Sequence, residues 1–182
     1  MNLPNKLTMV RIALVPLVVI VYLCIGDNFW VMDETSGLAF RDVLSLLFFA
    51  TASITDMLDG MIARKYHLIT SFGKFVDPIA DKLLVNTVLI MLAYTHQANI
   101  IAVLLMIARD LFVDGLRMTA ASQGKVVSAG FYGKLKTVLQ MVAIVFLLLK
   151  NWPFSYLGLP VDQILLWAAT LASLYSGYIY FM

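Results

Sequence analysis

Charged residues are scarce in this sequence. They make up 13% of its 182 residues, whereas a typical soluble domain carries about 25%. Hydrophobic residues make up 62%, and the mean hydropathy is +0.89. This balance argues against a soluble globular protein and leaves no room for a separate soluble domain. We therefore expect a single membrane domain over residues 1–182, because spans of about 20 apolar residues would fill the chain.

Cysteine pairs, low-complexity tracts and a strong net charge are also missing. Cys24 is the single cysteine, which excludes a disulfide within the sequence. Tracts rich in Pro, Ser and Gly are absent, which argues against disorder. The net charge is only +2, and we expect no nucleic-acid partner.

Long apolar runs recur along the chain and predict an all-α, polytopic integral membrane protein. The second and fifth runs are short for a bilayer core of about 30 Å, so we expect them to extend into their flanks. The first run is similar to a signal-peptide core, but no small-x-small cleavage site follows Gly26, so we expect an uncleaved span. The six predicted transmembrane helices are Thr8–Ile25, Phe40–Ile54, Ile79–Tyr94, Ile100–Leu116, Leu135–Leu149 and Val161–Phe181.

Basic residues are distributed unequally between the two ends of these spans. Only Arg41 and Lys150 fall on one side. The positive-inside rule places the other side, with both termini, in the cytoplasm. We expect a multi-pass cell-membrane protein whose chemistry faces the cytoplasm. The cytoplasmic bases are Lys6, Arg11, Arg64, Lys65, Lys74, Lys82, Arg109, Arg117, Lys125, Lys134 and Lys136.

Carboxylates and small residues gather on that side, between the second and third spans. Residues 56–64 hold two carboxylates, two small residues and one arginine, which on a helix share a sector of about 140°. After eight more residues come a glycine and two carboxylates one turn apart. Four carboxylates at membrane depth need cations, and hard oxygen ligands suit a site for two Mg²⁺ or Mn²⁺ ions. These residues are Asp56, Asp59, Gly60, Ala63, Arg64, Gly73, Asp77 and Asp81.

This spacing is similar, at every fixed position, to the signature of the CDP-alcohol phosphotransferases. These membrane enzymes move a phosphatidyl or similar group from a CDP-linked donor to an alcohol. Asn5, Thr8 and Arg11 resemble the amino-terminal element of the family. Residues 108–117 and 133–140 resemble the branch whose acceptor is glycerol 3-phosphate. The resemblance runs from Asn5 to Gln140, and the last span contributes only hydrophobicity.

The resemblance implies a two-metal site, a donor site and a homodimer. The four aspartates would bind two divalent ions at the CDP diphosphate, and Asp81 would also act as the general base on the acceptor hydroxyl. Gly60 and Ala63 leave room for a large group, and Arg64 can fork onto a phosphate. The residues expected to bind CDP-diacylglycerol are Asn5, Thr8, Gly60, Ala63, Arg64, Thr70 and Gly73.

An acceptor that carries its own phosphate needs a separate set of fixed cations. Four bases at the cytoplasmic ends of the fourth and fifth spans can supply them, which favours phosphatidyl transfer to glycerol 3-phosphate with release of CMP. A sibling enzyme for serine, inositol phosphate or phosphatidylglycerol is the alternative. A cation transporter is a weaker one, because its acids would spread across the bilayer. The four bases are Arg109, Arg117, Lys134 and Lys136.

Simpler interpretations stay open for several of these residues. Asp77 before Pro78 is typical of a helix N-cap. The four bases can be snorkelling residues of the membrane interface. Arg11 can anchor its helix or bind a ligand. Asp110 and Asp114 are expected to be internal partners of Arg117 or the lysines.

Overall fold

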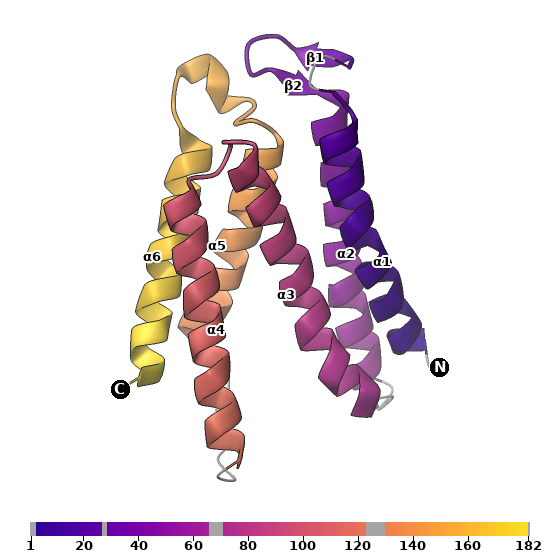
Figure 1. Ribbon diagram of the computed structural model, residues 1–182, viewed down its shortest axis with the longest axis vertical. Coiled ribbons are helices and arrows are strands. Elements are labelled where there is room, and N and C mark those ends of the chain that lie inside the picture. The colour runs from indigo at the N-terminus through magenta and orange to yellow at the C-terminus, as the bar shows by residue number, and fades with distance from the viewer. Residues whose placement is uncertain (1–2, 27–28, 66–70, 123–129, 182) are drawn as a thin grey trace. The chain divides into compact units, whose positions relative to one another are not determined.

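The computed structural model describes residues 3–26, 29–65, 71–122 and 130–181; for residues 3–7, 57–60, 62–65, 71–78, 81, 121 and 180–181 it describes the backbone alone. The chain divides into two compact units, Met1–Met91 and Leu92–Met182 (Figure 1). A single membrane domain over the whole chain stays a prediction.

Six α-helices form within the described residues, as the six apolar runs predicted. Five of them extend past their runs, always at the end that carries the basic residues: α2, for example, ends at Lys65 instead of Ile54. Lys, Arg, Glu and Ala are good helix formers, so the end of an apolar run is not the end of a helix. The helices are α1 Leu3–Cys24, α2 Phe40–Lys65, α3 Ser71–Tyr94, α4 Ile100–Ser122, α5 Phe131–Leu148 and α6 Val161–Phe181.

One described helix, α5, is long and apolar enough over Phe131–Leu148 to cross a membrane. Two shorter apolar stretches, Thr8–Cys24 and Lys82–Tyr94, lie within α1 and α3. The all-helical character of the chain is confirmed, apart from one small hairpin. Six membrane spans with both termini in the cytoplasm stay a prediction.

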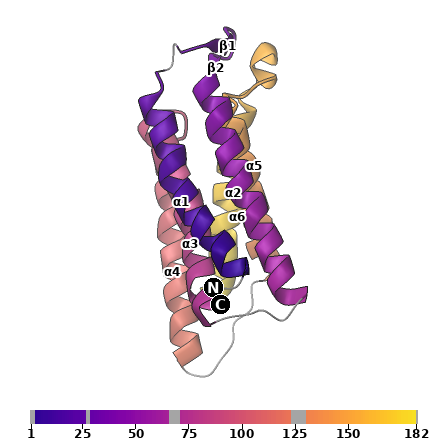
Figure 2. The ribbon, with the colours of Figure 1, turned by 90° about the vertical axis from the view of Figure 1, so that its right-hand side faces the viewer.

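In the first unit α1 packs against α2, and a short antiparallel hairpin lies between them in the chain (Figure 2). Its strands are β1 Val31–Asp33 and β2 Leu38–Ala39. The backbone N–H and the hydroxyl of Ser36 both donate to Asp33 Oδ2, at 3.0 and 2.6 Å. This hairpin departs from the all-α expectation because local hydrogen bonds, rather than an apolar pattern, hold its turn.

Arg41, one of the two bases on the predicted outer side, is buried between helix ends. Its Nη1 donates to the carbonyls of Tyr22 and Ile25, each at 3.4 Å, and its guanidinium carbon lies 4.6 Å from the centre of the Tyr22 ring. Asp42 accepts the backbone N–H of Ala39 at 2.9 Å at the start of α2. Arg41 therefore satisfies carbonyls at the end of α1, which have no partner within the helix.

In the second unit α6 packs against both α5 and α4, and a 3₁₀ helix, η1 Phe154–Leu157, lies in the connection from α5 to α6. Gln163 Nε2 donates to the Gln97 carbonyl at 2.6 Å and so fixes the start of α6 to the connection between α3 and α4. This packing brings Ser176 of α6 next to Arg109 of α4. The buried apolar side chains of α5 and α6 include Ala143, Ile144, Leu147, Leu148, Leu166 and Ala169.

Candidate active site

The backbone confirms the helical placement of the signature. α2 continues without a break to Lys65, and α3 begins at Ser71. Helical periodicity therefore holds through both halves of the motif. The side chains of Asp59, Gly60, Ala63, Arg64, Gly73, Asp77 and Asp81 lie outside the described residues, as do the side chain of Asn5 and the whole of Thr70.

Asp77 does not begin a helix. α3 starts at Ser71, six positions earlier, so Asp77 and Pro78 lie in its interior. An N-cap residue lies at the first turn of a helix, where backbone N–H groups have no partner. The N-cap interpretation of Asp77 is therefore wrong, and the metal-ligand interpretation stays a prediction.

Asp56 is the one predicted metal ligand whose side chain is described, and it pairs with Arg11 of α1. Arg11 Nη1 lies 2.5 Å from Asp56 Oδ1. The Arg11 side chain is 0% exposed, whereas that of Asp56 is 38% exposed. The buried guanidinium thus holds one oxygen of a carboxylate that stays partly open to the surroundings. Thr8, one turn before Arg11, is also buried.

Among side chains that the structure describes, no three His, Cys, Asp or Glu groups cluster closely enough to hold a metal ion. Three of the four predicted ligands are outside that set. The donor chemistry fits a hard divalent cation, because Asp56 offers a carboxylate with an exposed edge and α2 carries Asp59 one turn later.

In the second unit, Asp110 of α4 gathers two of the predicted acceptor-binding bases. Lys136 Nζ of α5 donates to both carboxylate oxygens, at 2.7 and 2.5 Å. Arg109 Nη1 donates to Oδ1 at 3.0 Å, and Arg109 Nη2 donates to the hydroxyl of Ser176 in α6 at 2.8 Å. The expectation that Asp110 is an internal partner of a lysine is confirmed. Two cations therefore share the Asp110 carboxylate.

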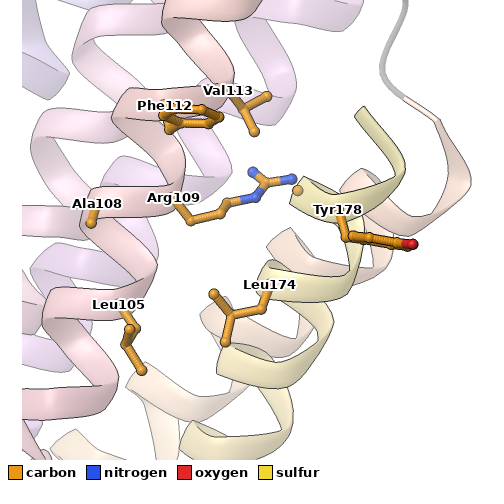
Figure 3. Close-up of a pocket in the computed structure, with 8 residues that line it drawn as sticks. Leu105, Ala108, Arg109, Phe112, Val113, Leu174 and Tyr178 are labelled. Atoms are coloured by element: carbon orange, nitrogen blue, oxygen red, sulfur yellow. The ribbon is translucent and has the colours of Figure 1, made fainter. Parts of the chain in front are cut away.

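Arg109 also borders an apolar cavity between α4 and α6. The cavity has a volume of about 410 Å³, and nearly all of its lining is apolar. Figure 3 shows the Arg109 side chain reaching from α4 toward α6, above Leu105 and Leu174. The Arg109 side chain is only 11% exposed, and at such a position water screens its charge less than it does at an open surface.

The other two predicted acceptor bases lie on the same two helices. Arg117 lies on α4 two turns beyond Arg109, half-buried, and Lys134 lies exposed in the first turn of α5. Arg109 and Lys136 are thus largely buried and held by Asp110, whereas Arg117 is half-buried and Lys134 is exposed.

Comparison with known proteins gives one family over nearly the whole chain. The family model for CDP-alcohol phosphatidyltransferases matches residues 1–175. The chain belongs to the CDP-alcohol phosphatidyltransferase family. This match confirms the family that the spacing of the aspartates predicted for this transferase.

Several curated relatives of this family member share one name. The CDP-diacylglycerol–glycerol-3-phosphate 3-phosphatidyltransferase of Bacillus subtilis (strain 168) is 43% identical over 182 residues, 99% of this chain and 93% of the relative. The relative of the same name from Rickettsia bellii (strain RML369-C) is 44% identical over the same shares. That from Salmonella choleraesuis (strain SC-B67) is 34% identical over 163 residues, 87% of this chain and 83% of the relative.

The contribution of the last helix to this transferase was missed by the sequence interpretation. The last span was expected to contribute only hydrophobicity, yet Ser176 bonds to Arg109 and Gly177 lies against the same side chain. Small and hydroxyl residues within an apolar helix are typical of close helix–helix contacts, and Ser173, Ser176 and Gly177 form such a group. That pattern was the available signal.

Proposed function

We propose that this chain transfers the phosphatidyl group of CDP-diacylglycerol to sn-glycerol 3-phosphate, which yields phosphatidylglycerophosphate and CMP. The observation that carries the proposal is the identity of 43–44% over 99% of the chain to relatives named for this reaction. The two cations held at Asp110 support an acceptor with its own phosphate. A sibling acceptor, such as serine, inositol phosphate or phosphatidylglycerol, is the alternative within the family.

The donor is bound by the first unit. Asp56, Asp59, Asp77 and Asp81 would hold two divalent cations, Mg²⁺ or Mn²⁺, which stabilise negative charge on the diphosphate oxygens when bound. The partly exposed Asp56 carboxylate and the helical spacing of the other three are consistent with this role. The nucleotide end of the donor contacts Asn5, Thr8, Gly60, Ala63, Arg64, Thr70 and Gly73.

Asp81 accepts the proton of the attacking hydroxyl. The glycerol 3-phosphate oxygen attacks the phosphorus that carries diacylglycerol, the bond from that phosphorus to the bridging oxygen breaks, and CMP leaves with the electron pair. A carboxylate that can reach the hydroxyl is a suitable general base, and such a base contributes about 10²–10⁴-fold to a rate.

The acceptor phosphate is bound by the second unit. Arg109 and Lys136 are fixed on Asp110, and Arg117 and Lys134 extend the basic surface on α4 and α5. A guanidinium can donate two parallel hydrogen bonds to a phosphate, which makes binding specific as well as tight. An acceptor without a phosphate would make no use of these donors.

The enzyme acts as a multi-pass protein of the cell membrane, with its active site in the cytoplasm and with two copies forming a homodimer. Rows of large apolar side chains on α4 and α6 are exposed, as expected of surfaces that face lipid. The helices extend beyond their apolar runs at the basic ends, where the site residues lie. These exposed residues include Ile101, Leu104, Leu111, Phe112, Ile164, Leu171 and Tyr178.

An acceptor panel tests the proposal. Purified protein with CDP-diacylglycerol and Mg²⁺ receives each acceptor separately, and CMP release is measured. We expect release with glycerol 3-phosphate well above release with water, serine or inositol phosphate. Equal release with glycerol 3-phosphate and with water would refute the acceptor assignment, while release with serine would favour the sibling enzyme.

A further inference from the structure

The last two turns of α6 hold the Arg109 side chain from two directions. Ser176, which is 1% exposed, accepts a hydrogen bond from Arg109 Nη2 at 2.8 Å. Gly177 lies so close that a methyl group built on it would be 3.0 Å from Arg109 Cγ and 3.1 Å from Nε. Carbon atoms in ordinary contact are about 3.5–4.0 Å apart. A side chain at position 177 would therefore push the arginine by a few tenths of an ångström.

We propose that Ser176 and Gly177 are positioning residues that fix the Arg109 guanidinium for the phosphate of the acceptor. The inference rests on the proposed function, because it takes Arg109 as a phosphate-binding group. Both residues lie past residue 175, where the family match ends.

The contacts of the guanidinium leave donors available for a ligand. Nη1 donates to Asp110 and Nη2 donates to Ser176, and each of these nitrogens carries a second N–H, whereas Nε is buried against α6. A guanidinium has five N–H donors in a rigid plane. Fixing two of them to α4 and α6 sets the direction of the others.

Fixing the side chain in advance favours binding. Arginine has several rotatable bonds, and a ligand that must first order a free arginine loses affinity. Asp110 supplies the counter-charge, Ser176 sets the tilt of the guanidinium plane, and the bare backbone at Gly177 lets the aliphatic part of Arg109 lie against α6. The helix that the sequence marks only as apolar thus sets the affinity for the acceptor.

Steady-state kinetics with both substrates varied tests the role of Ser176. We expect Ser176→Ala to raise KM for glycerol 3-phosphate about tenfold, the effect of losing one hydrogen bond to a charged group. KM for CDP-diacylglycerol and kcat should stay within about twofold, because neither depends on the tilt of Arg109. Ser176→Thr keeps a hydroxyl and should restore most of the affinity.

Ser173→Ala is the matched control. Ser173 lies one turn earlier on α6 and is equally buried, but its hydroxyl has no hydrogen-bond partner among the described residues. Its removal should leave both KM values unchanged. An equal rise of KM for glycerol 3-phosphate in both serine variants would overturn the proposal, because it would show a general effect of repacking α6.

Gly177→Ala tests the steric part. The added methyl should displace Arg109 and raise KM for glycerol 3-phosphate by about tenfold or more, even though alanine is the better helix former. Gly115→Ala on α4 is its control, because nothing lies within 4 Å of the added methyl there. Unchanged acceptor kinetics in Gly177→Ala would overturn the steric part.

A double-mutant cycle with Arg109→Ala separates this inference from the proposed function. If Ser176 acts through Arg109, Ser176→Ala should have no further effect on KM in the Arg109→Ala background. Full additivity would overturn the positioning role. If Arg109→Ala alone leaves KM for glycerol 3-phosphate unchanged, the phosphate-binding role of Arg109 fails. If Arg109→Ala raises KM and Ser176→Ala does not, the positioning inference alone fails.

Discussion

The charge pairs beside the two sets of site residues are built in opposite ways. In the first unit the cation is hidden: Arg11 is fully buried, and the Asp56 carboxylate is 38% exposed. In the second unit the buried group at the centre is a carboxylate, Asp110, and it is shared by Arg109 and Lys136. The first pair presents its carboxylate to the surroundings, whereas the second sets two largely buried cations against one carboxylate. A metal ion needs a carboxylate that it can reach, and a phosphate needs cations that donate hydrogen bonds.

Asp81→Asn is the strongest test of the carboxylate side. Turnover should fall by about 10³-fold or more, because a metal ligand and the proton acceptor are lost together. CMP release from CDP-diacylglycerol and glycerol 3-phosphate measures it. Asp162→Asn, the same change at the start of α6, should leave turnover within about twofold. Near-normal turnover in Asp81→Asn would remove Asp81 from the base role.

Asp110→Asn tests the cationic side. The free energy of unfolding should drop by about 3 kcal/mol, because two largely buried cations lose their counter-ion. The double variant Asp110→Asn/Lys136→Gln should recover at least about 1 kcal/mol of that loss, since one of the cations is then gone. Denaturant unfolding in detergent measures both. If the double variant were less stable than the single one, Asp110 would not be the shared counter-ion.

The first pair should show an asymmetry that follows from exposure. Asp56→Asn leaves a buried guanidinium without its carboxylate and should cost about 2 kcal/mol of stability. Arg11→Met keeps the volume and leaves a carboxylate that solvent can reach, so we expect a loss of about 1 kcal/mol or less. Thermal unfolding of the two variants gives the order. A larger loss of stability in Arg11→Met than in Asp56→Asn would contradict this account, because it would show that the partly exposed carboxylate needs its partner more than the buried guanidinium does.

The helices could be predicted from the sequence, but not all of their ends. Apolar runs mark helices because membrane spans and buried faces both need them, and six runs gave six helices. The runs stop at the first charges, whereas α2 continues from Ile54 to Lys65 because backbone hydrogen bonds tolerate polar side chains. The N-cap interpretation of Asp77 failed for the same reason: the apolar run starts only at Ile79, whereas the helix α3 starts at Ser71.

The site could be predicted where it is local and not where it depends on packing. The spacing of Asp56 and Asp59 is a property of one helix and can be recognised in the sequence. The contact of Ser176 with Arg109 joins residues 67 positions apart, and it exists only because α6 packs against α4. Which base pairs with Asp110 could not be decided from the sequence for the same reason, since Lys136 comes from another helix.

Kinetics of Arg109→Ala with both substrates varied most directly tests the division between a carboxylate site and a phosphate site. KM for glycerol 3-phosphate should rise by about 10- to 100-fold, as expected for the loss of charge-assisted hydrogen bonds, while KM for CDP-diacylglycerol stays within about twofold. A rise of KM for the donor instead of the acceptor, or an equal rise of both, would contradict the assignment of the second unit to the acceptor.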